Sequence, residues 1–298
     1  MRRLCYTSCV PINFQRALCV PILLVAAACS LPAARFDALA EQAGLVRAVV
    51  AGAGFAHLVY SAAAGADDRG PVWVYIEGDG TPWIDETIAA DDPTPRTPVA
   101  MPAMIEGPRP AIFLGRPCYF GVGDVAAPPA AGRRCSPIWW THRRFAPEVI
   151  ESMAAALRRI VAANGWQRRP INLVGFSGGG TLAVLMAPRV PRLCAVVTLA
   201  SPLDTDEWTR SRRYSTLEGS VNPASRPPLP VSVAQLHLRG ALDRVVAADN
   251  GAEFRRRNPA AEFRTLPLAH GREWIAAWRE ILRDGDSRAL KRCAQVNE

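Results

Sequence analysis

A serine in a glycine-rich turn is the residue of this chain whose surroundings most clearly indicate covalent chemistry. Residues 175–179 read Gly-Phe-Ser-Gly-Gly and fit the pattern G-x-S-x-G, between a strand-like stretch at residues 171–174 and a helix-like stretch at residues 181–187. In this pattern the serine lies on a strained turn, and glycines leave room for it. The next helix directs free N–H groups and the positive end of its dipole at the hydroxyl. The sequence therefore predicts that Ser177 is a nucleophile.

A serine hydroxyl becomes a strong nucleophile only when a base accepts its proton, and that base needs an orienting acid. His270 follows an expected strand at residues 263–266, and Asp243 follows another at residues 231–239. Because the carboxyl ends of parallel strands meet at one edge of a sheet, both side chains are expected beside the serine turn. Asp204 also follows an expected strand and is the rival for the acid, although we favour Asp243.

The other three histidines are less suited to the role of base. His57 and His142 precede the serine in the chain, and His237 lies inside an expected strand. A histidine inside a strand usually has a structural role. We therefore predict that His270 is the base.

Acyl transfer also needs hydrogen-bond donors for the charge that develops on the substrate oxygen. The N–H of Gly178, directly after the nucleophile, is one predicted donor. The second is Asp79 or Gly78, in the glycine-rich turn that follows a buried strand at residues 72–76. Glu77 and Asp79 also have the chemistry of metal ligands, but no histidine or cysteine stands at ligand spacing from them. The sequence therefore predicts no metal site and no cofactor.

The elements that must position these groups alternate between strands and helices. We expect helices at residues 36–50, 147–164, 181–187, 246–256 and 274–283, and strands at residues 55–60, 72–76, 111–114, 171–174, 195–200, 231–239 and 263–266. This alternation predicts a mainly parallel sheet with helices on both faces. Residues 81–145 are rich in proline and weakly periodic, and we expect them to form a cap or loop insertion over the active edge, because long ordered loops in compact domains are usually functional. Residues 201–230 form a second loop-rich insertion.

The composition suits one α/β domain with a leader segment. The chain has 298 residues and a formal net charge of +8, and its only lysine is Lys291. Its arginines are scattered in short pairs that match no nucleic-acid-binding signature, so no nucleic-acid partner is predicted.

Residues 1–29 have the features of an export signal. Arginines precede an apolar run at residues 17–28, which is too short for a comfortable transmembrane helix. Small residues directly before Cys29 resemble a bacterial lipobox, which predicts lipidation of that cysteine and a membrane anchor. The alternative is an ordinary signal peptide, cleaved near Ala28 or Ala34.

Cysteines of an exported protein are natural disulfide partners. Cys118 and Cys135 lie within the proline-rich segment, and we expect a disulfide between them that holds this loop; two free buried thiols are the alternative. Cys194 lies in an apolar strand and is expected to be an inert core thiol. Cys293, near the C-terminus, has no obvious partner in the sequence.

The chain resembles the α/β-hydrolase superfamily across roughly residues 45–285. It resembles more narrowly a group of uncharacterised bacterial lipoprotein hydrolases. The stretches that carry this narrower resemblance are the serine turn and residues 75–80, 92–95, 116–118, 140–141, 202–204 and 219–223. Where the family usually has a His-Gly dipeptide before the oxyanion hole, this chain has Glu77-Gly78. The resemblance implies an α/β-hydrolase fold over a domain at residues 30–298, and cofactor-free hydrolysis of an ester, thioester or amide.

The function expected from these observations is hydrolysis of a carboxylic ester through an acyl-enzyme, with a small-molecule or lipid acyl substrate. A thioesterase or peptidase with the same triad is an alternative, and so is a non-catalytic envelope-binding lipoprotein on a hydrolase fold. The expected location is the periplasmic face of the bacterial cell envelope, held by the lipid anchor. Without lipidation, the protein is expected to be periplasmic or secreted.

Overall fold

The computed structural model describes residues 32–62, 70–85, 87–122 and 134–295. The expected export signal and Cys29 lie outside these residues. Within the described part of the chain, no helix combines the length and apolar character needed to cross a membrane.

The described residues form an eight-stranded sheet with the order β1-β2-β4-β3-β5-β6-β7-β8. Its strands are β1 (Val46–Ala51), β2 (Ala56–Ala62), β3 (Val72–Ile76), β4 (Ala111–Leu114), β5 (Ile171–Phe176), β6 (Leu193–Leu199), β7 (Ala234–Gly240) and β8 (Glu262–Leu266). Strand β2 is antiparallel to both of its neighbours, and all other neighbouring strands are parallel. The predicted mainly parallel sheet is therefore confirmed.

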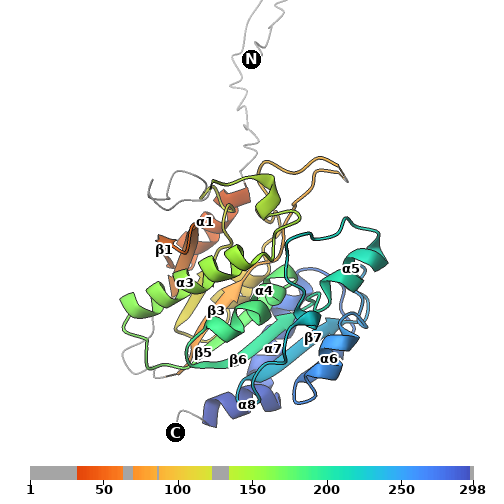
Figure 1. Cartoon of the computed structure of the whole chain (residues 1–298). Coiled ribbons are helices and arrows are strands. Elements are labelled where there is room, and N and C mark those ends of the chain that lie inside the picture. Colours follow the sequence, from red (N-terminus) through yellow and green to blue (C-terminus); the bar gives the residue numbers. More distant parts are fainter. Residues whose placement is uncertain (1–31, 63–69, 86, 123–133, 296–298) are drawn as a thin grey trace, which may run out of the picture. The chain divides into compact units, whose positions relative to one another are not determined.

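Helices cover both faces of this sheet, as predicted. They are α1 (Pro32–Gln42), α2 (Ala100–Ile105), α3 (Pro147–Ala163), α4 (Gly178–Met186), α5 (Thr205–Arg212), α6 (Ala252–Arg257), α7 (Glu273–Asp284) and α8 (Arg288–Gln295). Helices α3 and α4 pack on each other in front of the sheet in Figure 1, and α7 lies behind it. Helix α2 packs on α7, so it covers the same rear face. Strands β3 and β5, between these layers, are fully buried.

Several expected elements were wrong in type or extent. The helix expected at residues 36–50 ends at Gln42, and residues 46–51 form the exposed edge strand β1 instead. Gly44 adopts a left-handed conformation, with φ of 64°, between the two elements, and pairing with β2 then fixes the strand. The helix expected at residues 246–256 begins only at Ala252. Helices α2, α5 and α8 lie in segments where we expected no regular structure.

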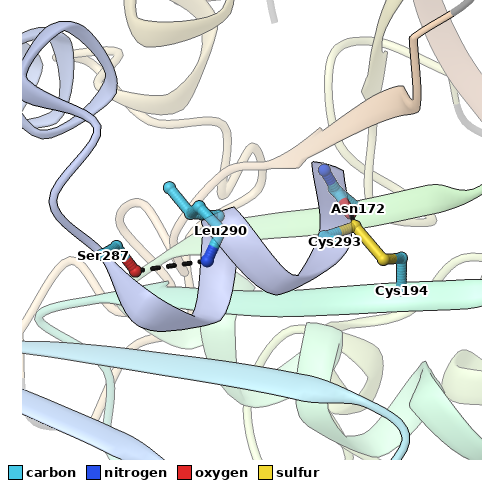
Figure 2. The surroundings of a disulfide bond; sticks show 5 residues. All are labelled: Asn172, Cys194, Ser287, Leu290 and Cys293. Carbon is cyan, nitrogen blue, oxygen red and sulfur yellow. Dashed lines mark hydrogen bonds between the residues drawn. A yellow bond between two sulfur atoms is a disulfide. The ribbon is translucent and has the colours of Figure 1, made fainter. Parts of the chain in front are cut away.

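Cys194 and Cys293 form a second disulfide, which corrects the prediction of an inert thiol and a partnerless cysteine. The bond joins β6 to α8, with a Cα–Cα distance of 5.6 Å across 99 residues of chain. Figure 2 shows that Cys293 points from α8 to Cys194, with Asn172 of β5 beside the bond. The Ser287 hydroxyl accepts a hydrogen bond from Leu290 N–H at the start of α8. The short terminal helix is thus capped at one end and covalently attached at the other.

We expect removal of this disulfide to destabilise the protein without impairing its chemistry. Closing a loop of this length restricts the unfolded chain, so the Cys194→Ala/Cys293→Ala double variant should lose about 2–4 kcal/mol of unfolding free energy. Urea denaturation measures the loss, and wild-type protein with reductant is the control. An unchanged midpoint would show that the bond contributes nothing to stability. The bond joins the amino end of β6, so the loops at the carboxyl ends of the strands should keep their structure.

Two histidines are completely buried, and this makes the stability of the fold depend on pH. Burial lowers the pKa of His57 from 6.5 to about 4, and burial followed by the positive charge of Arg239 lowers the pKa of His237 to about 3. Between these values and pH 6.5 the unfolded chain binds protons that the folded chain does not. The stability that these neutral histidines contribute is therefore present above pH 6.5 and is lost as pH falls through about 4 for His57 and about 3 for His237.

We expect the free energy of unfolding to fall between pH 7 and pH 5 by about 2 kcal/mol for each buried histidine. Urea midpoints across this range measure the slope. His57→Gln should be less stable than wild type at pH 7, because it loses bonds to Gly115 and Ser152, but should show a smaller pH slope. If the stability of His57→Gln depended on pH as strongly as that of wild type, burial of His57 would not be a source of the pH dependence.

Candidate active site

The serine turn has the strained geometry that a nucleophile needs. Ser177 follows β5 directly and precedes α4, with φ of 51° and ψ of −128°. A positive φ is uncommon for a residue other than glycine, so the surrounding structure must enforce it. The Ser177 N–H donates to the Leu199 carbonyl at 2.8 Å, which ties the turn to the end of β6.

Two glycines make the turn possible because β5 and α4 meet almost backbone to backbone. A Cβ on Gly175 would overlap the backbone of Gly179, and a Cβ on Gly179 would overlap the Ile76 carbonyl at the end of β3. The pattern that singled out Ser177 thus reflects close approach between strand and helix.

The structure brings the three predicted catalytic side chains together. His270 Nε2 lies 3.0 Å from Ser177 Oγ, and His270 Nδ1 lies 2.7 Å from Asp243 Oδ2. The Asp243 side chain is fully buried, whereas His270 retains 14% exposure. The imidazole can therefore exchange protons with both the serine and a molecule bound at the site.

Two neighbouring loops hold the acid and the base. Asp243 Oδ1 accepts hydrogen bonds from the N–H groups of Val245 and Val246, at 2.7 and 2.8 Å, so its other oxygen is left to His270. The Leu242 N–H donates to the Leu268 carbonyl at 3.0 Å, which joins the acid loop to the histidine loop. These hydrogen bonds hold Asp243 and His270 in one arrangement, although the two residues are far apart in the sequence.

Asp204, the alternative candidate for the acid, lies at the start of α5. Its side chain accepts hydrogen bonds from the N–H of Glu207 and from the Asn222 amide, at 3.1 and 2.8 Å. It therefore caps the N-terminus of α5, and its contacts indicate a structural role.

The remaining histidines have structural partners too. His57 bonds the Gly115 carbonyl and the Ser152 hydroxyl, at 2.9 and 2.8 Å, in the buried core between β2 and α3. No carboxylate of the described residues is hydrogen-bonded to this His57–Ser152 pair, and burial closes it to substrate. His237, inside β7, is hydrogen-bonded to Thr198 Oγ1 at 2.9 Å. His142 is hydrogen-bonded to the Thr216 carbonyl at 2.9 Å and also lines the cavity beside Ser177.

Of the three backbone N–H groups predicted to bind the oxyanion, two have no hydrogen-bond acceptor in the described part of the chain and one has an acceptor. Among the described residues, no acceptor bonds the N–H of Gly178 or of Asp79. The Gly78 N–H donates to Glu77 Oε1 at 3.1 Å, so it is not available. Gly178 and Asp79 are therefore the better pair of donors.

Glu77, directly before the turn with the predicted oxyanion donors, caps a helix. Its second oxygen accepts from the N–H groups of Val99 and Ala100 at the start of α2, both at 3.0 Å. Burial raises the pKa of Glu77 to about 7, and bonds to backbone N–H groups oppose that shift. The Glu77 side chain thus links the turn at residues 77–80 to the start of α2. The sequence pattern alone did not indicate this link.

A cavity of about 1110 Å³ opens above the serine. Both segments expected to be loop-rich contribute to its wall, the first with Trp83 and Arg96 among others and the second with Trp208 and Tyr214 among others. Trp208 and Tyr214 pack edge to face at 5.4 Å within that wall. The predicted Cys118–Cys135 disulfide is present, with a Cα–Cα distance of 5.5 Å.

Within the described ranges, no three His, Cys, Asp or Glu side chains are grouped closely enough to hold a metal ion. Ser177 and His270 line the cavity, and with the buried Asp243 they have the residue types of a nucleophile, a base and an orienting acid.

Comparison with known proteins supports the fold. No model of a protein family matches the chain, and no curated protein matches it either. The structure is similar to an esterase of Pyrococcus furiosus, Pf2001, with 15% identity, a TM-score of 0.56, and coverage of 85% of this chain and 92% of that one. It is also similar to an α/β serine hydrolase homologue from Coxiella burnetii, with 17% identity, a TM-score of 0.53, and coverage of 81% and 97%.

A third similar structure is a putative α/β-hydrolase of unknown function from Agrobacterium tumefaciens, with 10% identity, a TM-score of 0.51, and coverage of 81% and 98%. At such identities the likeness concerns the fold, and the narrower resemblance to lipoprotein hydrolases stays a prediction. With its sheet order and its strand–serine–helix turn, this chain has the α/β-hydrolase fold.

Proposed function

We propose that this protein is a serine hydrolase that cleaves carboxylic esters through an acyl-enzyme. The observation that carries the proposal is the hydrogen-bonded series Ser177–His270–Asp243, with distances of 3.0 and 2.7 Å, of which Ser177 and His270 line an open cavity. The esterases and serine hydrolases among the structural neighbours support it.

The geometry accommodates each proton transfer of such a reaction. Ser177 Oγ attacks the acyl carbonyl while His270 Nε2 accepts its proton, and Asp243 stabilises the imidazolium. The carbonyl oxygen, now negative, accepts from the N–H groups of Gly178 and Asp79. His270 then protonates the leaving alkoxide. Water, deprotonated by His270, releases the acid and restores Ser177.

Thioesters and amides pass through the same intermediates, so the leaving group distinguishes these substrates. We infer the ester because neighbours that cover nearly whole chains are described as esterases or serine hydrolases. Two further similar structures, an acylaminoacyl peptidase from Pyrococcus horikoshii and a puromycin hydrolase, are matched over only 41% and 40% of their chains. The non-catalytic alternative gives no reason for three catalytic side chains to lie in hydrogen-bonding series.

A fluorophosphonate probe tests whether Ser177 is activated, because it labels serines whose proton is withdrawn by a base. Wild type should be labelled, and 4-nitrophenyl butyrate should give a burst of nitrophenol as the acyl-enzyme forms. Ser177→Ala should give neither signal, whereas Ser215→Ala, at an exposed serine on the same cavity wall, should give both. Absence of labelling in folded wild type would favour a non-catalytic protein.

We propose further that the protein is exported and anchored by lipid at Cys29. Two disulfides support export, because such bonds persist in oxidising compartments. The anchor itself rests on the sequence at residues 17–30.

Metabolic labelling tests the anchor. Palmitate supplied to expressing cells should enter the wild-type protein, because a lipidated N-terminal cysteine carries acyl chains that hold it at the membrane. Cys29→Ala should lose the label, whereas Cys19→Ala, at a cysteine inside the apolar run, should keep it. Incorporation that survives Cys29→Ala would contradict attachment at Cys29, and absence of label in the wild-type protein would contradict the lipid anchor altogether.

A further inference from the structure

A buried carboxylate lies directly against the candidate oxyanion hole. The Asp79 side chain packs on the Cα of Gly178 so closely that a Cβ there would overlap Asp79 Oδ1. Gly178 and Asp79 also provide the two available N–H groups. An unpaired carboxylate at this distance would repel the oxyanion and so raise the reaction barrier, because like charges interact strongly in a site of low dielectric constant.

Two arginines reverse the sign of the charge at this position. Arg116 Nη1 contacts Asp79 Oδ1, and Arg144 Nη1 donates to Asp79 Oδ2 at 2.9 Å. The arginine side chains are only 1% and 5% exposed. Burial disfavours the charged form of Asp79, but both arginines outweigh burial and lower its pKa. The ionised cluster therefore carries two positive charges and one negative charge, a net charge of +1.

The same cluster fixes the backbone of Asp79. The Tyr119 hydroxyl donates to the Asp79 carbonyl at 3.1 Å. Arg144 Nε donates to the Thr141 carbonyl at 2.7 Å, and Arg116 Nη2 donates to the Arg144 carbonyl at 3.3 Å. The peptide of Asp79 is thus held on its carbonyl side by Tyr119 and through its side chain by two segments distant in sequence.

We infer that Asp79 and Arg144 are positioning residues for the proposed hydrolysis: their ion pair, shared with Arg116, holds the Asp79 N–H in the oxyanion hole and keeps the adjacent charge positive. This inference rests on the proposed function. Cys118 lies between Arg116 and Tyr119, so its disulfide with Cys135 restrains the segment that supplies both partners of Asp79.

Loss of Arg144 should slow the chemical step, whereas the affinity for substrate in the ground state should stay the same. Without Arg144, Asp79 and Arg116 leave a cluster of zero net charge, and the side chain of Asp79 loses one of its two anchors. Loss of a direct oxyanion donor lowers kcat by about 10²–10³-fold, and Arg144 acts one contact further away. For Arg144→Gln we therefore expect kcat to fall by about 10- to 100-fold with KM nearly unchanged.

The experiment compares Arg144→Gln, Arg144→Lys and Arg143→Gln by esterase kinetics with 4-nitrophenyl butyrate and by inhibition with an aryl trifluoromethyl ketone. This neutral ketone becomes an oxyanion when Ser177 adds to it, so its inhibition constant reports on the hole. In Arg144→Gln the inhibition constant should rise by the same factor as kcat/KM falls. Lysine keeps the charge but cannot reproduce both bonds of Arg144, so it should restore part of the loss.

Arg143→Gln is the matched control because it removes the same charge from the neighbouring position. Arg143 pairs with Glu148 and stacks on Trp139, away from Asp79. The Arg143→Gln variant should retain the kcat and the inhibition constant of wild type within about twofold. Thermal unfolding should show that all three variants are folded. Equal values for Arg144→Gln and wild type, or equal losses in Arg144→Gln and Arg143→Gln, would overturn the inference. Wild type that neither hydrolyses ester nor reacts at Ser177 would instead overturn the proposed function.

Discussion

Replacing Ser177 with alanine is expected to lower kcat for 4-nitrophenyl butyrate by on the order of 10⁶-fold. The variant lacks the only atom that can form the acyl-enzyme at this site, so the reaction would have to proceed by direct attack of water. His270→Ala should lose nearly as much, because the base and the nucleophile act as one unit and their effects are not additive.

Burst kinetics measure kcat in each variant. The amplitude of the wild-type burst gives the concentration of active sites. A Ser177→Ala protein that retains a tenth of the wild-type rate would contradict the assignment. The Ser215→Ala variant controls for effects of substitution on the cavity wall.

The sequence predicted that Ser177, His270 and Asp243 would lie together, because local chemistry and the order of the strands determine their placement. A G-x-S-x-G turn requires glycines wherever β5 and α4 meet, and the structure shows that steric requirement at Gly175 and Gly179. Parallel strands place the loops that follow them at one edge, so the order of strands sufficed to bring Asp243 and His270 towards Ser177. Periodicity identified the long helix α3 almost to its ends.

What the sequence did not predict depends on pairing between distant segments. Residues 46–50 read as a continuation of a helix, and only the partner strand β2 makes them a strand. Glu77 and Arg144 have ordinary surface chemistry in the sequence, and their roles follow from segments 22 and 65 residues away. Helix α8 did leave a signal, since Ala289 and Cys293 are buried at a spacing of one helical turn, but the segment is short and its partner Cys194 is remote.

The second large effect is expected from the acid. Replacing Asp243 with asparagine should lower kcat by roughly 10⁴-fold, because an amide that donates to His270 Nδ1 favours the tautomer whose Nε2 carries the proton. That tautomer cannot accept the proton of Ser177. The asparagine keeps the size of the side chain and one acceptor oxygen for the N–H groups of Val245 and Val246, so the fold should persist.

Asp204→Asn is the matched control, because the same chemical change is made at the other aspartate that follows a strand. Its oxygen can still accept from the Glu207 N–H, so α5 keeps a cap and the loss of stability should be about 1 kcal/mol or less. Its kcat should stay within about twofold of wild type, since no chemical step passes through this side chain. Kinetics of both variants, with thermal unfolding to verify folding, decide between the aspartates. An inactive Asp204→Asn beside an active Asp243→Asn would reverse the assignment, and the hydrogen bond between Asp243 and His270 would then have only a structural role.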